Sequence, residues 1–122
     1  HISQIDFDDE VTKAGEGVWV VLHLFKNGVP ECQLVNQCLN ALAPKFKATK
    51  FLKIISTDCI PNYPDRNLPT ILVYYEGAPK ANLVGMTALG AKDLQPQDLE
   101  WTLKTIGAVP SKMKDHPRKS NI

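Results

Sequence analysis

Three cysteines and three histidines are the side chains best suited to redox or metal chemistry. They are Cys32, Cys38 and Cys59, and His1, His23 and His116. No CxxC pair occurs and the histidines are scattered, so the spacing does not match a zinc site. An odd count of widely spaced cysteines argues against a disulfide framework. Free thiols are typical of a reducing compartment, so we expect a cytoplasmic protein with no metal and no cofactor.

A polar loop between residues 57 and 67 is a second place where charged side chains gather. Asp58, Asp65 and Arg66 lie there together with Asn62 and Asn67. A cation site needs more oxygen ligands at regular spacing than this loop offers. Caps, turns and an ion pair are therefore the favoured interpretation of these residues.

The composition predicts one globular domain. The 122 residues are 43% hydrophobic and 22% charged, and the net charge is +1. Basic residues concentrate in 111–122, so we divide the chain into a domain over 1–110 and a solvated basic tail over 111–122. A domain with almost no net charge lacks the basic face that nucleic-acid binding usually requires. No apolar run approaches the roughly 20 residues of a membrane span.

Alternating strands and helices must position the thiols and the buried histidine. The run VWVVLHLF at Val18–Phe25 has the length and composition of a strand covered on both faces. Apolar residues at spacings of three and four predict a helix over 30–45 that carries Cys38 on its buried stripe. The other elements expected in this half are an edge strand at His1–Ile5, a helix over 6–14 and a strand over 50–56.

The second half predicts a hairpin followed by a helix. Strands over 70–75 and 80–84 flank a turn at 76–79, and 85–95 has no regular pattern. Pro96 opens a final helix that Gly107 ends. The order β-α-β-α-β-loop-β-β-α predicts an α/β fold whose mixed central sheet has helices on both faces.

The segment NLPTILVY at residues 67–74 resembles the cis-proline segment of thioredoxin-fold proteins. The resemblance implies that the Leu68–Pro69 peptide bond is cis. The longer segments VTKAGEGVWVVLHLF, CIPNYPDRNLPT and DLEWTLKTIGAV resemble phosducin-like proteins, in particular the phosducin-like protein 3 subgroup (also called viral IAP-associated factor). This likeness extends from about Ile2 to Arg118.

The resemblance implies a thioredoxin-like domain of a cytosolic co-chaperone. It implies binding to the cytosolic chaperonin and an effect on the folding of client proteins such as actin, tubulin or G-protein β subunits. The helical region that precedes this domain in the family would lie upstream of His1. A regulator that binds G-protein βγ dimers, as the phosducin branch does, stays open as an alternative.

Whether this chain keeps the two cysteines of the thioredoxin active site decides between a binding domain and an enzyme. Alignment on the strand and helix places Val29 at the attacking thiol and leaves only Cys32, at the resolving position. A valine forms no thiolate, so the two-cysteine cycle is lost and we expect no enzyme. A single-thiol redox protein using Cys32 stays open, as does a minor alternative with a Cys32–Cys59 bridge.

His23 occupies the place where thioredoxins keep a buried carboxylate that moves protons for the resolving thiol. A relay from His23 to Cys32 is one interpretation, and a neutral core histidine is the favoured one. The helix start favours a thiolate, whereas apolar surroundings oppose it. We therefore expect the Cys32 pKa to lie at or modestly below the ordinary value of about 8.5.

Trp101 is the candidate partner-binding residue. With roughly 100° per helical residue, Trp101 falls on the side of the final helix opposite the Leu99 stripe. A large aromatic residue away from the core is typical of partner surfaces, so we expect substantial exposure. Coverage by the segment after Gly107, or by the upstream region, is the equal alternative.

Overall fold

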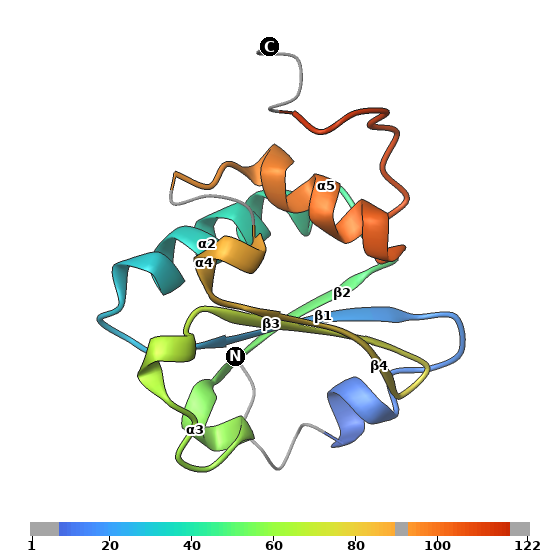
Figure 1. Ribbon diagram of the computed structural model, residues 1–122. Coiled ribbons are helices and arrows are strands. Elements are labelled where there is room, and N and C mark those ends of the chain that lie inside the picture. Colours follow the sequence, from blue (N-terminus) through green and yellow to red (C-terminus); the bar gives the residue numbers. More distant parts are fainter. Residues whose placement is uncertain (1–7, 90–92, 118–122) are drawn as a thin grey trace.

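A four-stranded mixed sheet forms the centre of the computed structural model, which describes residues 8–89 and 93–117 (Figure 1). The strands are β1 (Trp19–Phe25), β2 (Lys50–Ile55), β3 (Thr70–Tyr75) and β4 (Ala78–Val84), in the spatial order β2-β1-β3-β4. β1 pairs with β2 in parallel, and the β1–β3 and β3–β4 pairs are antiparallel. The edge strand expected at His1–Ile5 lies outside the described residues.

Helices cover both faces of the sheet. On one face lie α2 (Pro30–Leu42), α4 (Gly85–Leu89) and α5 (Pro96–Ile106). On the other lie η1, a π-helical turn at Asp8–Thr12, and α3 (Ser56–Cys59) (Figure 1). A 3₁₀ turn, η2 (Asp65–Asn67), leads to β3. The predicted α/β fold with helices on both faces is confirmed.

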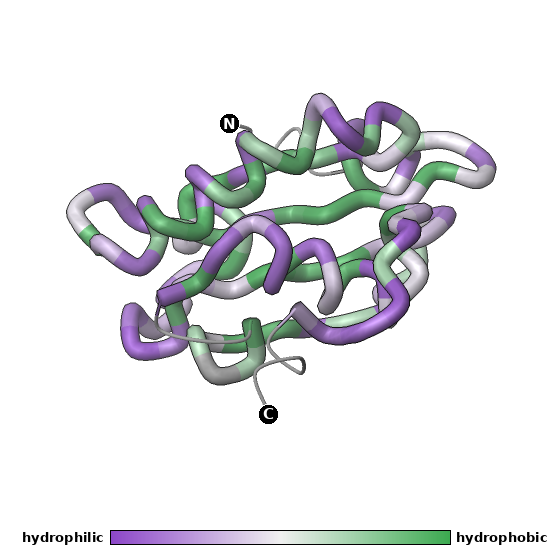
Figure 2. The backbone as a smooth tube through the Cα atoms, turned by 90° about the horizontal axis from the view of Figure 1, so that it is seen from above, coloured by the Kyte–Doolittle hydropathy of each residue, from purple (hydrophilic) through white to green (hydrophobic). Residues whose placement is uncertain are grey.

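β1 is buried on both sides, as its apolar sequence, interrupted by His23 alone, predicts. Six of its seven residues are buried, and Figure 2 shows hydrophobic backbone positions concentrated in the strands. Alternate side chains of a strand point to opposite faces. Val21 accordingly packs in one cluster with α2 and α5, whereas Val20, Leu22 and Leu24 pack in another with Val11 of η1.

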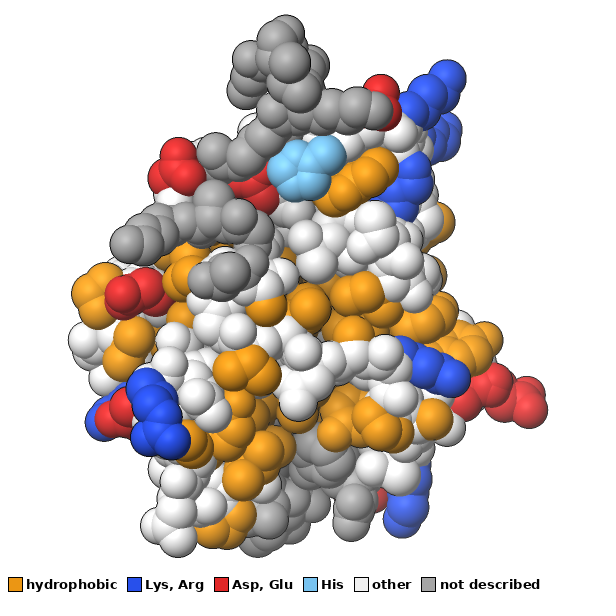
Figure 3. Space-filling view, viewed as in Figure 1, with side chains coloured by type: hydrophobic (Ala, Val, Ile, Leu, Met, Phe, Trp, Pro, Cys, Tyr) orange, Lys and Arg blue, Asp and Glu red, His pale blue; other side chains and the backbone are white. Residues whose placement is uncertain are grey.

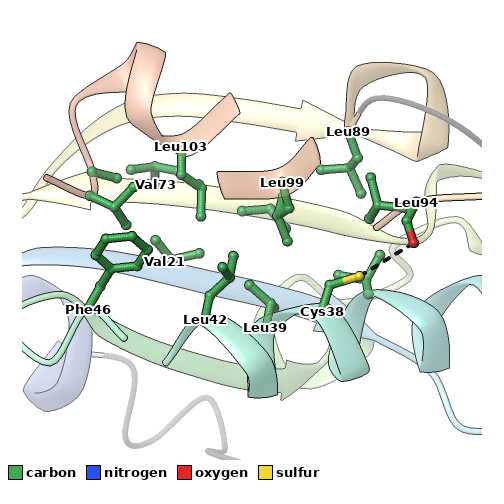
Figure 4. Close-up of a cluster of buried hydrophobic side chains, with 14 residues drawn as sticks. Val21, Cys38, Leu39, Leu42, Phe46, Val73, Leu89, Leu94, Leu99 and Leu103 are labelled. Atoms are coloured by element: carbon green, nitrogen blue, oxygen red, sulfur yellow. Dashed lines mark hydrogen bonds between the residues drawn. The ribbon is translucent and has the colours of Figure 1, made fainter. Parts of the chain in front are cut away.

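The larger core lies between the sheet, α2 and α5 (Figure 4). Val21 and Val73 from the sheet meet Leu39 and Leu42 of α2 and Leu99 of α5 there. The apolar stripes at spacings of three and four place these helical residues on the faces that meet. This core fixes the position of α2, whose first turn carries the candidate thiol.

Element boundaries differ from the sequence expectations at two helices. α2 ends at Leu42 instead of residue 45, and the amides of Lys45 and Phe46 both donate to the Leu42 carbonyl to close it. Pro44 follows directly, where its missing N–H cannot continue a helix. Of the expected helix over 6–14, the π-helical turn η1 covers Asp8–Thr12; residues 13–14 are not helical, so the expected end was wrong, and residues 6–7 lie outside the described ranges.

α4 lies in a segment that we expected to be irregular, and that expectation was wrong. Its last residue, Leu89, is fully buried in the core with Leu94 and Leu99. Tertiary burial of a short apolar segment stabilises helical turns that local propensity does not predict. The predicted α5 is confirmed over Pro96–Ile106, with a capping box at its start and Gly107 in the left-handed conformation at its end.

Candidate functional site

The first turn of α2 is the position that carries the catalytic thiols in the thioredoxin arrangement. Val29 is the N-cap residue in extended conformation, and Pro30 is the first helical residue, where a missing N–H costs nothing. Val29 offers no side-chain cap and no thiol. The sulfur of this site is therefore that of Cys32, in the first turn.

Cys32 is buried. The residue is 1% exposed and belongs to the cluster of buried residues that also contains Val11, Leu22 and Leu24. Burial raises the pKa of the thiol, a hydrogen bond with the Lys26 backbone opposes this, and the charges of Glu31 and Asp65 add to the rise. The expected value at or below the ordinary pKa is thus wrong, because burial outweighs the helix start.

His23 is fully buried on the other face of β1, the one that carries Val21. The Nδ1 atom lies 2.7 Å from Oδ1 of Asn36. An amide oxygen only accepts, so Nδ1–H donates and the neutral ring keeps its lone pair on Nε2. Nε2 has no hydrogen-bond partner among the described residues. Burial lowers the pKa of His23 to about 4; the Asn36 hydrogen bond opposes that shift and the Lys53 charge adds to it.

The structure does not pair His23 with Cys32. The Nδ1 atom of the histidine hydrogen-bonds Asn36 and its Nε2 atom has no partner among the described residues, so neither ring nitrogen bonds the Cys32 thiol. A neutral ring at ordinary pH also supplies no positive charge to a thiolate. The arrangement matches the core histidine of the favoured interpretation and gives the relay no geometric support.

A pocket of about 310 Å³ nevertheless reaches Cys32. Its lining combines the β1–α2 turn with the first two turns of α2, namely Phe25, Lys26, Asn27, Gly28, Val29, Cys32, Gln33 and Asn36. This pocket offers a route by which a small thiol-reactive molecule could approach the sulfur. It keeps the single-thiol alternative open to experiment.

Alkylation of Cys32 is expected to show a high pH midpoint. In a Cys38→Ala, Cys59→Ala background, the rate of iodoacetamide reaction should rise with a midpoint above that of a free thiol measured in parallel, because burial disfavours the thiolate. Stopped assays at a series of pH values, read by mass spectrometry, provide the measurement. A midpoint below about 6 would mark a reactive cysteine and contradict the burial argument.

The other two cysteines are structural. Cys38 is buried, and its thiol donates to the Leu94 carbonyl at 3.7 Å (Figure 4). Cys59 is half-buried against the η1-face core. Burial raises the pKa of both thiols. All three cysteines are free, so the structure contains no Cys32–Cys59 bridge.

The Leu68–Pro69 peptide bond is cis, the isomer that the resemblance implies. The Pro69 carbonyl accepts a hydrogen bond of 2.9 Å from the amide of Gly85. The Thr70 hydroxyl donates to the Asn67 carbonyl and accepts from the Tyr63 hydroxyl, each at 2.7 Å. These bonds hold the loop before β3.

Asp65 in the same loop pairs with Lys26 at 2.6 Å. Both side chains are more than half exposed, so the pair contributes little to stability. Within residues 8–89 and 93–117, no group of three or more His, Cys, Asp or Glu side chains is arranged to hold a metal.

Comparison with known proteins settles the family. The phosducin family model matches residues 2–117 of this chain. The chain belongs to the phosducin family. It is 54% identical to phosducin-like protein 3 of Danio rerio and 52% identical to that of Mus musculus, over 97% of this chain and 49% of each relative. Phosducin-like protein 2 of Drosophila melanogaster is 48% identical over 96% of this chain and 49% of its own length.

The chain thus spans about half the length of the curated relatives it matches. Its mixed sheet with flanking helices is consistent with the thioredoxin-like domain of phosducin-like proteins. No helix in the described part of the chain has the length and apolar character needed to cross a membrane.

Trp101 of this phosducin-like domain is half-buried, not substantially exposed as expected. The ring of His116 meets its ring edge-on at a centroid distance of 6.1 Å, and the Lys104 ammonium lies 5.4 Å from its ring centroid. The segment after Gly107 therefore contacts the tryptophan, which was the alternative left open. A solvent-facing part of the ring remains.

Sequence reasoning missed a polar cluster beside this segment. The Glu100 carboxylate, almost fully buried, accepts from Lys45 Nζ at 2.8 Å and from the Ser111 hydroxyl at 2.5 Å. Burial alone would raise the pKa of Glu100, but the two hydrogen bonds and the Lys45 charge lower it. The only sequence signal is a charged residue next to the Leu99 stripe, which is common on helices that carry no such cluster.

Proposed function

We propose that this chain is the non-catalytic, partner-binding domain of a cytoplasmic co-chaperone that binds the cytosolic chaperonin and modulates the folding of its clients. Membership in the phosducin family carries the proposal. Phosducin-like proteins are known as co-chaperones. In this proposal the domain contributes a folded binding surface rather than a reactive group.

The residues at the positions of the two thioredoxin cysteines support the proposal that the domain is non-catalytic. Val29 stands at the attacking position, and a two-cysteine cycle needs a thiolate there. Cys32, the remaining thiol, is 1% exposed and has a raised pKa. Reactive cysteines have the opposite properties, a lowered pKa and partial exposure.

The single-thiol redox protein is the second candidate, because a pocket reaches Cys32. An insulin-reduction assay with dithiothreitol separates it from the co-chaperone. We expect the protein to accelerate insulin precipitation no more than a Cys32→Ser variant does. A precipitation rate that depends on Cys32 would favour the single-thiol redox protein over the co-chaperone.

A pull-down with the full-length protein tests the partners. Immobilised protein should retain purified cytosolic chaperonin and retain little purified G-protein βγ. Retention of βγ without chaperonin would favour the regulator instead. Retention of neither would remove both partner assignments.

Trp101 is proposed as part of the chaperonin-binding surface. Trp101→Ala should weaken binding roughly tenfold, since aromatic anchors dominate interface energies. Because the ring is half-buried and contacts Lys104 and His116, the free energy of unfolding should fall by only about 1 kcal/mol. Trp101→Phe, which keeps a ring, is the matched control. Unchanged affinity in the alanine variant would exclude this surface.

A further inference from the structure

A groove separates the end of α2 from α5 and the chain that follows it. Its volume is about 620 Å³. We call it the α2–α5 groove, and its lining consists of Lys45, Phe46, Glu100, Pro110, Ser111, Lys112 and Met113. These residues come from three parts of the chain that only the tertiary fold brings together.

The walls of the α2–α5 groove are held in place by the Glu100 cluster. Glu100 binds Lys45 from one wall and Ser111 from the other. The Ser111 hydroxyl in turn accepts from the Met113 amide at 3.2 Å. A groove whose walls are tied together loses little conformational entropy when it is occupied, which favours binding.

The α2–α5 groove is lined by both apolar and basic side chains. Phe46, Pro110 and Met113 supply apolar surface, and the Lys45 ammonium lies 5.4 Å from the Phe46 ring centroid. Lys112 is exposed at the edge. The charge of the Glu100 carboxylate is balanced by the Lys45 ammonium, and Ser111 adds a hydrogen bond, so Lys112 carries the uncompensated charge of the lining. The groove therefore presents net positive charge beside apolar surface.

Basic side chains also surround the rim. Lys114 is exposed two positions beyond Lys112. Figure 3 shows basic side chains at the upper right, with an acidic one beside them, in the region where Figure 1 draws the chain after α5. Lys112 and Lys114 outnumber the exposed Asp115 there, and a local excess of positive charge attracts acidic ligands.

We propose that the α2–α5 groove binds a short acidic segment of a partner protein. An apolar side chain of that segment would sit against Phe46, Pro110 and Met113, and a carboxylate would pair with Lys112, whereas Lys45 stays paired with Glu100. Charge complementarity selects this occupant. Nucleic acid fits less well, because two lysines, one of them already paired with Glu100, are a small phosphate footprint.

The inference goes beyond the proposed function, which specifies neither this groove nor the chemistry of its ligand. Fluorescence anisotropy with a fluorescein-labelled peptide, in which glutamates flank a central leucine–phenylalanine pair, tests it directly. We expect saturable binding that weakens as salt rises. A peptide with serines in place of the apolar pair should bind roughly tenfold more weakly, since it lacks the anchor.

Two charge-reversal variants provide the decisive comparison. Lys112→Glu should weaken binding roughly tenfold, because it places a negative charge at the groove rim. Lys114→Glu makes the same change at an exposed position that does not line the groove, and should change binding by less than about twofold. Within the described residues, neither lysine forms an ion pair or side-chain hydrogen bond whose loss would destabilise the fold.

An equal loss of peptide affinity in both variants would overturn the proposal, since it would indicate that the peptide is attracted to the basic segment as a whole. Absence of saturable binding would overturn it as well. Amide shifts in NMR spectra should be largest at Phe46, Ser111 and Met113 when the peptide is added, and shifts centred elsewhere would contradict the site. The chaperonin pull-down is a separate measurement, so failure of the proposed function and failure of the groove are distinguishable.

Discussion

Lowering the pH from 6.5 to about 4 is expected to remove about 3 kcal/mol from the free energy of unfolding through His23 alone. The folded protein holds the pKa of His23 at about 4, against the ordinary value of 6.5. Desolvation of the buried ring is the main cause, because the charged form would lose its hydration. The difference between these two pKa values, about 2.5, sets the size of the loss in the free energy of unfolding.

The sign follows from which state binds the proton. Between pH 6.5 and about 4, the unfolded chain takes up a proton at His23 and the folded chain does not. Stability is therefore complete above pH 6.5 and falls as the pH decreases. The lowered pKa of the Glu100 carboxyl also makes stability fall as the pH decreases, but only below its ordinary value of 4.5. The interval from 6.5 to 5 therefore isolates the histidine.

Urea unfolding followed by circular dichroism at several pH values measures this dependence. His23→Leu is the control, because leucine has similar bulk and no titrating group. The variant leaves Asn36 without its hydrogen bond, so its absolute stability will differ, but its stability should be nearly constant from pH 6.5 to 5. If the free energy of unfolding changed equally with pH in both proteins, His23 would not be the cause of the pH dependence.

Leu99→Ala is expected to cost about 3 kcal/mol of the free energy of unfolding. Leu99 is fully buried where α5 meets α2 and α4, among Leu39, Leu42 and Leu89. Removing its outer carbons leaves a cavity that rigid neighbours from three helices and the sheet cannot fill (Figure 4). Urea denaturation at pH 7 gives the value.

Ile106→Ala is the matched control on the same helix. It removes a side chain of equal size from the same apolar stripe, but Ile106 is only partly buried against that core. Its cost should be about half that of Leu99→Ala, because less apolar area returns to water. Equal costs would contradict the placement of Leu99 at the centre of the α2–α5 contact.

The local sequence determined the elements with strong and self-consistent signals. The apolar run of β1 predicted burial on both faces, and Gly107 predicted the end of α5, because a left-handed residue there suits glycine. The candidate thiol could likewise be placed on the first turn of α2. At Val29, residue type alone excludes a thiolate, whatever the fold around it.

The surroundings of each candidate residue were decided by the tertiary structure. Local pattern could not predict α4, because Leu89 becomes helical by packing into a core built from distant segments. The pKa of Cys32 depends on apolar neighbours from η1 and β1, and the exposure of Trp101 depends on His116.

The sequence by itself therefore determined which groups are present and which periodic segments carry them. The tertiary structure decided which of those groups are buried, charged or joined. The Lys45–Glu100–Ser111 cluster spans 66 positions of the chain, and no local pattern links its members. The physical reason is that desolvation and hydrogen bonding depend on distances in space, which the chain sets only once its helices and sheet have packed.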